Sequence, residues 1–345
     1  MKSTRFITML LLGLFFYSCD DNDGVDLIDS SDPNAVIAAL EVEGAVFIEG
    51  MPPLPSEDQN APKLWEYEYD ELAKVGAGGN MNYSVDLSQG DVAGLYFQIE
   101  GADGYLDIPK TTLNQSFEVS DKHYMSRLLQ TQEDFALVIP IPEALTSGEI
   151  CVNYCVYDSE NRVSNVVSRC IEIVEPGGKN GDFLVGEWNA IKYVDHYDGM
   201  TYEYYFGVPD EYTYGTTIPC NDEIIEVEIT ESYEDKFLHV TYSKNGGLRY
   251  KAEMIDIYLD EENSNCSPSY LEETTAFDLN GVWSYDDSNG SIVLALEYEF
   301  SFEGVEKTEN VAIEGSIALE DGLLVLTQVG DEYPDEIFKM YFEKK

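Results

Sequence analysis

The chain has few basic residues. Its 345 residues include 67 Asp and Glu but only 19 Lys and Arg, and the formal net charge at pH 7 is −48. A surface of this sign repels phosphate groups, so we expect no nucleic acid partner and no electrostatic binding to anionic lipid headgroups. The acidity itself is typical of a solubilising surface, and it also suits a cation or a cationic partner.

Histidine and the common catalytic motifs are also scarce. The three histidines, His123, His196 and His239, lie far apart and none has the spacing of a zinc site. The sequence contains no GxSxG nucleophile motif, no Walker loop and no dinucleotide-binding fingerprint. We therefore expect no catalytic residue, no metal ligand and no cofactor. A hydrolase that uses two carboxylates remains an alternative, because so many acidic residues can form such a pair.

The N-terminus has the features of an export signal. Lys2 and Arg5 precede an apolar run, residues 6–17, that is too short to span a bilayer comfortably. A small residue and then Cys19 follow this run. The pattern resembles a bacterial lipoprotein signal, in which the cysteine becomes the lipidated first residue of the mature protein. The resemblance implies a signal peptide over residues 1–18 and membrane attachment through lipid on Cys19. An ordinary cleaved signal peptide is the alternative.

Residues 19–32 have little apolar content and many Asp residues, so they predict a flexible acidic tether. An EF-hand loop does not fit, because Val25 stands where a third oxygen ligand would be needed. The acidic residues directly after Cys19 resemble the surface-export signal of Bacteroidota lipoproteins. This resemblance implies a protein anchored to the outer membrane, on the cell surface rather than in the periplasm.

Residues 33–175 show short alternating segments with Gly-rich and Pro-rich breaks, which are typical of an antiparallel β-sandwich. The expected strands are residues 36–48, 83–87, 93–100, 135–141, 150–156 and 163–174. A short helix is expected only within residues 113–130. Residues 176–182 are rich in glycine and predict a linker to a second domain.

Residues 183–345 predict consecutive strands with tight turns. The expected strands are residues 183–194, 223–230, 236–243, 248–259, 281–285, 291–302, 311–318, 323–329 and 337–342. Such a run closes most economically as an up-and-down barrel, because closure removes exposed strand edges. Trp188 and Trp283 are expected in the core of this barrel. The mature chain is therefore expected to be all-β.

The hairpin over residues 150–174 predicts a disulfide. A turn centred between Glu160 and Asn161 pairs residues whose numbers sum to 321, so Cys151 faces Cys170 on the outer side of the sheet. Cys155 shares that side but lies about 13 Å from Cys151 at strand rise, and we expect it to stay free. A bond between Cys155 and Cys170 is the alternative, and it needs a turn two residues later.

Short motifs in both halves resemble those of Bacteroidota lipoproteins. Residues 148–178 resemble the closing hairpin of an Ig-like domain in these proteins. The segments LVGEWNAI from Leu184, PCNDEI from Pro219, NCSPS from Asn265 and LNGVWSY from Leu279 resemble a lipocalin-like domain of similar lipoproteins. In that domain, one Gly-x-Trp strand opens the barrel and a second follows a cysteine-bearing loop. The resemblance implies an N-terminal Ig-like β-sandwich followed by a C-terminal lipocalin-like up-and-down β-barrel, and it carries over no catalytic residue.

The same resemblance implies a bond between Cys220 and Cys266. Counted as a plain meander, the expected strands place these two cysteines at opposite ends of the barrel. The long loop expected over residues 260–278 has enough reach to bring them together.

Aromatic side chains supply the candidate ligand contacts. Tyr202, Tyr204 and Phe206 share one face of an expected strand, and Trp65 begins a segment in which aromatic and acidic residues alternate. Such rings stack on sugars or form protein interfaces, and they also commonly pack inward in β-proteins. We expect a lipid-anchored envelope protein that acts as a non-catalytic interaction or ligand-binding module. The alternatives are a cell-surface glycan-binding accessory protein and, less favoured, a carboxylate-dependent hydrolase.

Overall fold

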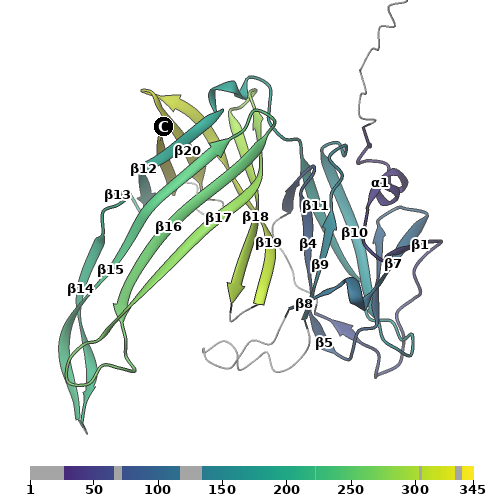
Figure 1. Cartoon of the computed structure of the whole chain (residues 1–345), viewed down its shortest axis with the longest axis horizontal. Coiled ribbons are helices and arrows are strands. Elements are labelled where there is room, and N and C mark those ends of the chain that lie inside the picture. Colours follow the sequence, from purple (N-terminus) through teal and green to yellow (C-terminus); the bar gives the residue numbers. More distant parts are fainter. Residues whose placement is uncertain (1–26, 66–71, 117–133, 222, 303–304, 331–335) are drawn as a thin grey trace, which may run out of the picture.

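The computed structural model describes residues 27–65, 72–116, 134–221, 223–302, 305–330 and 336–345. These residues form two β-rich domains that lie side by side, the first at the right of Figure 1 and the second, with much longer strands, at the left. None of the helices in the described ranges has the length and apolar character needed to cross a membrane.

Two main sheets build the first domain. The larger has the strand order β1 (Val46–Glu49), β7 (Gly104–Pro109), β6 (Gly94–Ile99), β10 (Gly148–Tyr157), β11 (Val167–Val174) and β3 (Ala73–Gly76). The smaller has the order β4 (Asn80–Val85), β9 (Asp134–Pro140) and β8 (Asn114–Ser116), and β2 (Lys63–Leu64) pairs with β5 (Leu87–Gln89). A single 3₁₀ turn, η1 (Lys110–Thr112), precedes β8.

One apolar core joins these sheets. Phe97 and Val152 of the larger sheet and Leu137 of the smaller are all fully buried in it. The Tyr83 ring of β4 lies 6.3 Å from Phe97 and 5.8 Å from Tyr154 across the core. The strand pairs within these two sheets are antiparallel except at one edge, where β3 pairs with β11 in parallel.

The strand expected over residues 36–48 is wrong in its first half. Helix α1 (Pro33–Ala39) forms there instead, and the strand begins only at Val46. Asp32 caps the helix by accepting hydrogen bonds from the backbone N–H groups of Asn34 and Ala35, and Pro33 occupies the first helical turn, where its missing N–H costs nothing. This cap and the pairing of Ile28 with Leu145 attach the end of the expected tether to the first domain. The helix expected within residues 113–130 falls mostly outside the described residues, and Leu113 leads directly into β8.

The second domain is one ten-stranded antiparallel sheet that closes on itself. Its order is β13 (Met200–Tyr205), β12 (Gly186–Tyr197), β21 (Ile337–Lys344), β20 (Leu323–Val329), β19 (Val305–Glu320), β18 (Ser291–Phe302), β17 (Tyr270–Asp286), β16 (Gly247–Leu259), β15 (Glu223–Tyr242) and β14 (Asp210–Cys220). An additional pairing joins the start of β12 to the end of β15. This pairing closes eight strands into a barrel, so the expected all-β barrel is confirmed.

One end of the barrel is filled by aromatic side chains. Trp188 and Trp283 are each only 2% exposed, as the sequence predicted, and Leu184 beside them is fully buried. The 3₁₀ turn η3 (Gly181–Phe183) leads into this cluster. The indole N–H of Trp188 donates to the carbonyl of Leu184, and that of Trp283 donates to the carbonyl of Ser243. This closed end is therefore a packed core.

The strands next to the barrel closure are longer than expected. Residues 223–230 and 236–243 form the single strand β15, and β17 begins at Tyr270 rather than at residue 281. Strand β14 was not among the expected strands. Because of this length, β14 and the adjoining parts of β15, β16 and β17 extend past the barrel toward the lower left of Figure 1. We call this extension, residues 207–235 and 253–278, the arm.

The expected linker is bound to the second domain. The N–H of Gly177 donates to the carbonyl of Trp283 at 2.6 Å, and the N–H of Tyr285 donates to the carbonyl of Gly177 at 2.7 Å. At the same junction, the carboxylate of Glu297 accepts hydrogen bonds from both the backbone and the side-chain N–H groups of Asn80, at 2.6 and 3.0 Å. These bonds fix the two domains against each other.

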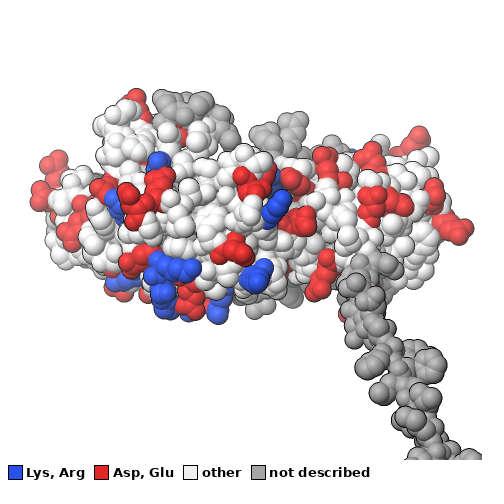
Figure 2. Space-filling model, turned by 90° about the horizontal axis from the view of Figure 1, so that it is seen from above, with Lys and Arg blue, Asp and Glu red and all other residues white. Residues whose placement is uncertain are grey.

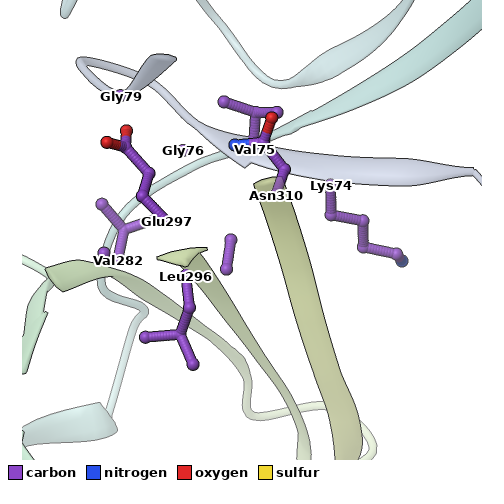
Figure 3. A pocket seen from close by; sticks show the side chains of 10 residues that line it. Lys74, Val75, Gly76, Gly79, Val282, Leu296, Glu297 and Asn310 are labelled. Atoms are coloured by element: carbon purple, nitrogen blue, oxygen red, sulfur yellow. The ribbon is translucent and has the colours of Figure 1, made fainter. Parts of the chain in front are cut away.

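The junction between the domains is tightly packed. Figure 3 shows Glu297 directed from the barrel toward Gly79, which lies in the turn between β3 and β4. Lys74 of the first domain pairs with Glu172 of its own domain at 2.9 Å and with Glu314 of the barrel at 3.0 Å. The hollow at this junction, lined by Lys74, Glu297 and Asn310 among others, has a volume of about 20 Å³, which holds a single water molecule at most.

Candidate binding surface at the open end of the barrel

The barrel opens because its two closing strands are bulged. The register between β12 and β21 shifts between Ala190 and Lys192, and that between β15 and β16 shifts between Asp235 and Phe237. A β-bulge bends and twists its strand, and bulges are frequent at barrel rims. Beyond these shifts β12 pairs with β13, and β15 pairs with β14, instead of pairing with each other. The barrel is therefore closed at the tryptophan end and split at the other.

An aromatic cluster lies at the start of this split. The Tyr193 ring stacks on Tyr204 at a centroid distance of 4.8 Å and contacts Phe338 at 5.5 Å and Phe206 at 6.1 Å. Phe206 is held there by its backbone N–H, which donates to the carbonyl of Ile191. The next residue along the chain then bonds to β15, so the connection between β13 and β14 crosses the split.

A carboxylate lies beside the cluster. The Tyr233 hydroxyl donates to Asp235 at 2.6 Å, and Tyr193 also forms a side-chain hydrogen bond to Asp235. Burial, and then the negative charge of Asp235, raise the pKa of both tyrosines, so their hydroxyls remain protonated donors. Burial, together with the charges of Glu273 and Asp235, also raises the pKa of Asp256.

We name Tyr193, Tyr204, Phe206, Tyr233, Asp235 and Asp256 the aromatic–carboxylate surface. Its ring faces suit an apolar or cationic group, and its carboxylates accept hydrogen bonds or balance positive charge. A ligand with positive charge would relieve the repulsion that raises the pKa of Asp256.

The structure brings together only some of the candidate aromatic residues. Tyr204 and Phe206 lie in the cluster. Tyr202 lies two residue pairs away from Tyr204 along β13, opposite Asp195, with 38% of its surface exposed. Trp65 is 49% exposed and lies in the first domain. Tyr193 and Asp235 were not among the expected ligand contacts, although Tyr193 lies in an expected strand. The bulges that turn the two side chains toward each other leave no clear sequence pattern.

A second hollow, with a volume of about 340 Å³, lies next to the Trp65 segment. Its walls include Leu64, Asn165 and Val163. The Leu64 and Asn165 groups there are bonded to each other, and the Val163 backbone is bonded to Ser56. These polar groups therefore stabilise the loop, and a ligand would compete with existing hydrogen bonds.

The disulfide between Cys151 and Cys170 is present, and the strand register around it is the expected one. Among the described cysteines only Cys155 is free. It is on the outer side of the sheet as expected, yet it is 1% exposed, and its closest strand neighbour is Tyr96, whose ring stacks on Tyr157 at 4.5 Å. Burial raises the pKa of the Cys155 thiol to about 12.

The disulfide between Cys220 and Cys266 is also present. It lies at the tip of the arm, where Cys220 pairs with Glu223 at the end of the β14–β15 hairpin. The expected strands placed the two cysteines at opposite ends of the barrel, because residues 223–243 were expected to form two strands and form the single strand β15. With one strand fewer, both cysteines lie at the same end. A loop was expected over residues 260–278. The loop in the structure ends at residue 269, because β17 starts at Tyr270.

The histidines and the potential metal ligands of the described residues already have hydrogen-bond or disulfide partners within the protein. His196 Nδ1 lies 2.8 Å from Thr201 Oγ1, and His239 Nδ1 lies 2.6 Å from Asn189 Oδ1. In the described ranges, one set of potential metal ligands was found, Glu149 with Cys151 and Cys170, and its two sulfurs form the disulfide. His123 and the expected lipidation site Cys19 lie outside the described residues.

Comparisons of this chain with protein-family models, with curated proteins and with solved structures find no match.

Proposed function

We propose that this chain is a lipid-anchored binding protein of the outer membrane, exposed at the cell surface, which uses no catalytic chemistry. In this proposal lipid on Cys19 holds an Ig-like sandwich, and the sandwich carries a lipocalin-like barrel that binds the ligand. The observation that carries the proposal is the shape of the barrel. It is packed with tryptophan at one end and split by bulges at the other, where the aromatic–carboxylate surface lies.

The chemistry of this surface supports binding. The Tyr193 and Tyr233 hydroxyls are already bonded to Asp235, so a ligand would meet side chains that are ordered in advance. The two disulfides are consistent with an oxidising compartment outside the cytoplasm, which agrees with the export signal. The resemblance to Bacteroidota lipoproteins points to the same location.

A glycan-binding accessory role is the second candidate. Trp65 is half exposed beside a hollow of about 340 Å³, and a Trp ring stacks well on a sugar. This volume falls within the usual range for small-ligand sites.

Lipid attachment is tested by feeding producing bacteria an alkyne fatty acid. The full-length protein should take up the label and sediment with the outer membrane, whereas Cys19→Ala should lose both properties. Protease added to intact cells should digest the protein if it is exposed at the surface. Unlabelled wild-type protein would overturn the anchor.

Ligand binding is tested on a glycan array and with organic cations such as spermidine, using tyrosine fluorescence as the readout. Tyr204→Ala should weaken binding at the aromatic–carboxylate surface. Tyr205→Ala is the matched control, because Tyr205 is the next residue of β13 and is exposed on the opposite face. Binding lost in Trp65→Ala alone would favour the glycan site. Hydrolytic turnover that depends on Asp235 or Asp256 would overturn a non-catalytic function.

A further inference from the structure

The arm ends in a strand with a free edge. β14 is the last strand of its sheet, and among the described residues it pairs only with β15. The pairing runs without a bulge for eleven residue pairs, from Asp210 to Cys220. Edge strands are usually protected by Lys, by an internal Pro or by a bulge, because an open edge accepts another strand. β14 has no Lys and no bulge, and its one proline, Pro219, is next to its end.

Pro219 identifies which backbone groups face the open side. The carbonyl of Pro219 accepts a hydrogen bond from the N–H of Cys266, which does not belong to β15, so this carbonyl points away from β15. Backbone groups of an edge strand alternate in direction with a period of two residues. The N–H and C=O groups of Glu211, Thr213, Gly215 and Thr217 therefore also point to the open side.

The disulfide loop covers only the tip of this edge. Cys266 bonds to Cys220 and to the Pro219 carbonyl, and Asn265 accepts a hydrogen bond from the N–H of Asn221. Residues 211–217 lie beyond this cover, and six of these seven residues are exposed. The open stretch is long enough to pair with a short extended segment.

The charge of the arm indicates what that segment is. Residues 207–235 contain nine Asp and Glu, residues 253–278 contain eight, and neither range contains a Lys or Arg. In the view of Figure 2 the Lys and Arg side chains gather on the barrel side of the molecule, and Asp and Glu spread over both domains. Such an arm repels a second copy of itself and attracts a basic segment.

Tyrosines next to the edge offer contacts to side chains of an added strand. Tyr212 and Tyr214 are 52% and 42% exposed, and their rings are nearly parallel, at 9°, with centroids 6.1 Å apart. Both hydroxyls bond to Glu231 of the neighbouring strand, which holds the rings in place. Exposed, ordered rings beside carboxylates suit the aliphatic and charged parts of Lys and Arg.

We propose that the free edge of β14 binds a basic, extended segment of a partner protein as an added strand. Backbone hydrogen bonds to Glu211, Thr213, Gly215 and Thr217 supply the pairing, and the acidic arm selects positive charge. This inference rests on the proposed interaction function. It concerns a different surface from the aromatic–carboxylate surface, so the two can fail separately.

The test uses the full-length protein in detergent and a synthetic peptide of about ten alternating Lys and Val residues. Gly215→Pro removes one outward N–H without touching a bond to β15, because proline is tolerated at an edge position of this kind. Gly215→Ala is the matched control, since an added Cβ at this position has no atom within 4 Å. A peptide of alternating Glu and Val controls for charge.

The wild type and Gly215→Ala should bind the Lys peptide with dissociation constants within about twofold of each other, because both keep the outward N–H. Gly215→Pro should weaken binding by about tenfold or more. Hydrogen exchange should show protection at residues 211, 213, 215 and 217 when the peptide is bound. The exchange measurement decides the case even if Gly215→Pro folds poorly.

Other results would overturn the proposal. Absence of peptide binding would do so, as would equal binding to wild type and Gly215→Pro, which would show charge attraction without strand pairing. A self-association of the wild type that Gly215→Pro abolishes would assign the edge to a second copy. Peptide binding that is lost in Tyr204→Ala but kept in Gly215→Pro would leave the proposed function standing and refute strand addition.

Discussion

The substitution Gly76→Ala should separate the two domains without damaging either. Gly76 is the last residue of β3, and a Cβ placed on it would lie 2.2 Å from Cγ2 and 2.8 Å from Cγ1 of Val282 in the barrel. Real Cβ atoms essentially never approach so closely. The backbone of Gly76 does not have a positive φ, so alanine adds no conformational strain there. The cost of the substitution therefore falls on the contact between the domains.

Relieving this overlap requires either a shift of the junction or its opening. Overpacking of a well-packed site usually costs about 1–3 kcal/mol. The junction also contains the Glu297–Asn80 hydrogen bonds and the Lys74–Glu314 ion pair, both of which a shift would lengthen. We expect Gly76→Ala to lower the thermal midpoint of the junction and to expose residues 175–181 to protease. Calorimetry should then show the two domains unfolding separately.

Val282→Ala provides the internal control. It removes both methyl groups that the new Cβ would strike, while the Val282 Cβ itself remains 3.0 Å away. That distance requires a shift of a few tenths of an ångström, so rescue should be partial. A double-mutant cycle should give a favourable coupling between the two substitutions. Two results would refute this role of the Gly76–Val282 contact. One is a Gly76→Ala variant with unchanged protease sensitivity and an unchanged X-ray scattering profile, and the other is the absence of rescue by Val282→Ala.

Three further outcomes follow from the structure. Replacing Cys220 and Cys266 together by Ser should destabilise the second domain by about 4 kcal/mol in the chain-entropy model, measured by urea unfolding without reductant, and amide exchange should rise first in the arm. Cys155, with its pKa raised to about 12, should resist iodoacetamide until the protein unfolds. The stability that the neutral Cys155 thiol gives to the folded state is present below pH 9 and is lost as pH rises toward 12. Glu297→Ala should cost about 1–3 kcal/mol in thermal unfolding, because it leaves the Asn80 N–H groups unpaired at the junction, and a neutral result would show that water replaces the carboxylate.

The hairpin of the first domain shows where sequence reasoning succeeds. The turn and the period of two fix its register, so Cys151 had one partner within reach. Helix α1 has a local start signal, Asp32 followed by Pro33, that was not used. The alternation of apolar and polar residues after it was interpreted as a strand instead. The burial of Cys155 was not predictable, because it depends on rings from other strands.

The division of β15 into two expected strands has a different cause. The run Glu231 to Asp235 is polar, and a polar run inside an apolar pattern indicates a turn. In the folded protein this run continues the strand, and Asp235 and Tyr233 lie on the aromatic–carboxylate surface. Polar residues occupy this position at some cost to stability, which is expected at a binding site. The candidate site therefore lies where the sequence pattern and the fold disagree most.

That cost can be measured at Asp256. Its pKa is raised by burial and by the charges of Glu273 and Asp235, so the folded state disfavours its ionised form. The stability from the protonated carboxyl is present below the unfolded pKa of 3.8 and is lost as pH rises through the folded pKa. Asp256→Asn should therefore raise the melting temperature at about pH 7 and leave it nearly unchanged at about pH 3.

Asp278 provides the opposite control on the neighbouring strand. Arg249 holds the pKa of Asp278 below its usual value through hydrogen bonds of 2.8 and 2.7 Å. Its ionised form stabilises the folded state above the unfolded pKa, and this stabilisation is lost as pH falls through the folded pKa. Asp278→Asn should therefore lower the melting temperature slightly at about pH 7, because the ion pair is exposed. Equal shifts of the melting temperature with the same sign for both variants would show that Asp256 is not destabilised by the charges of Glu273 and Asp235. A cationic ligand at the aromatic–carboxylate surface should stabilise wild type more than Asp256→Asn, because only the wild type keeps the repulsion that the ligand relieves.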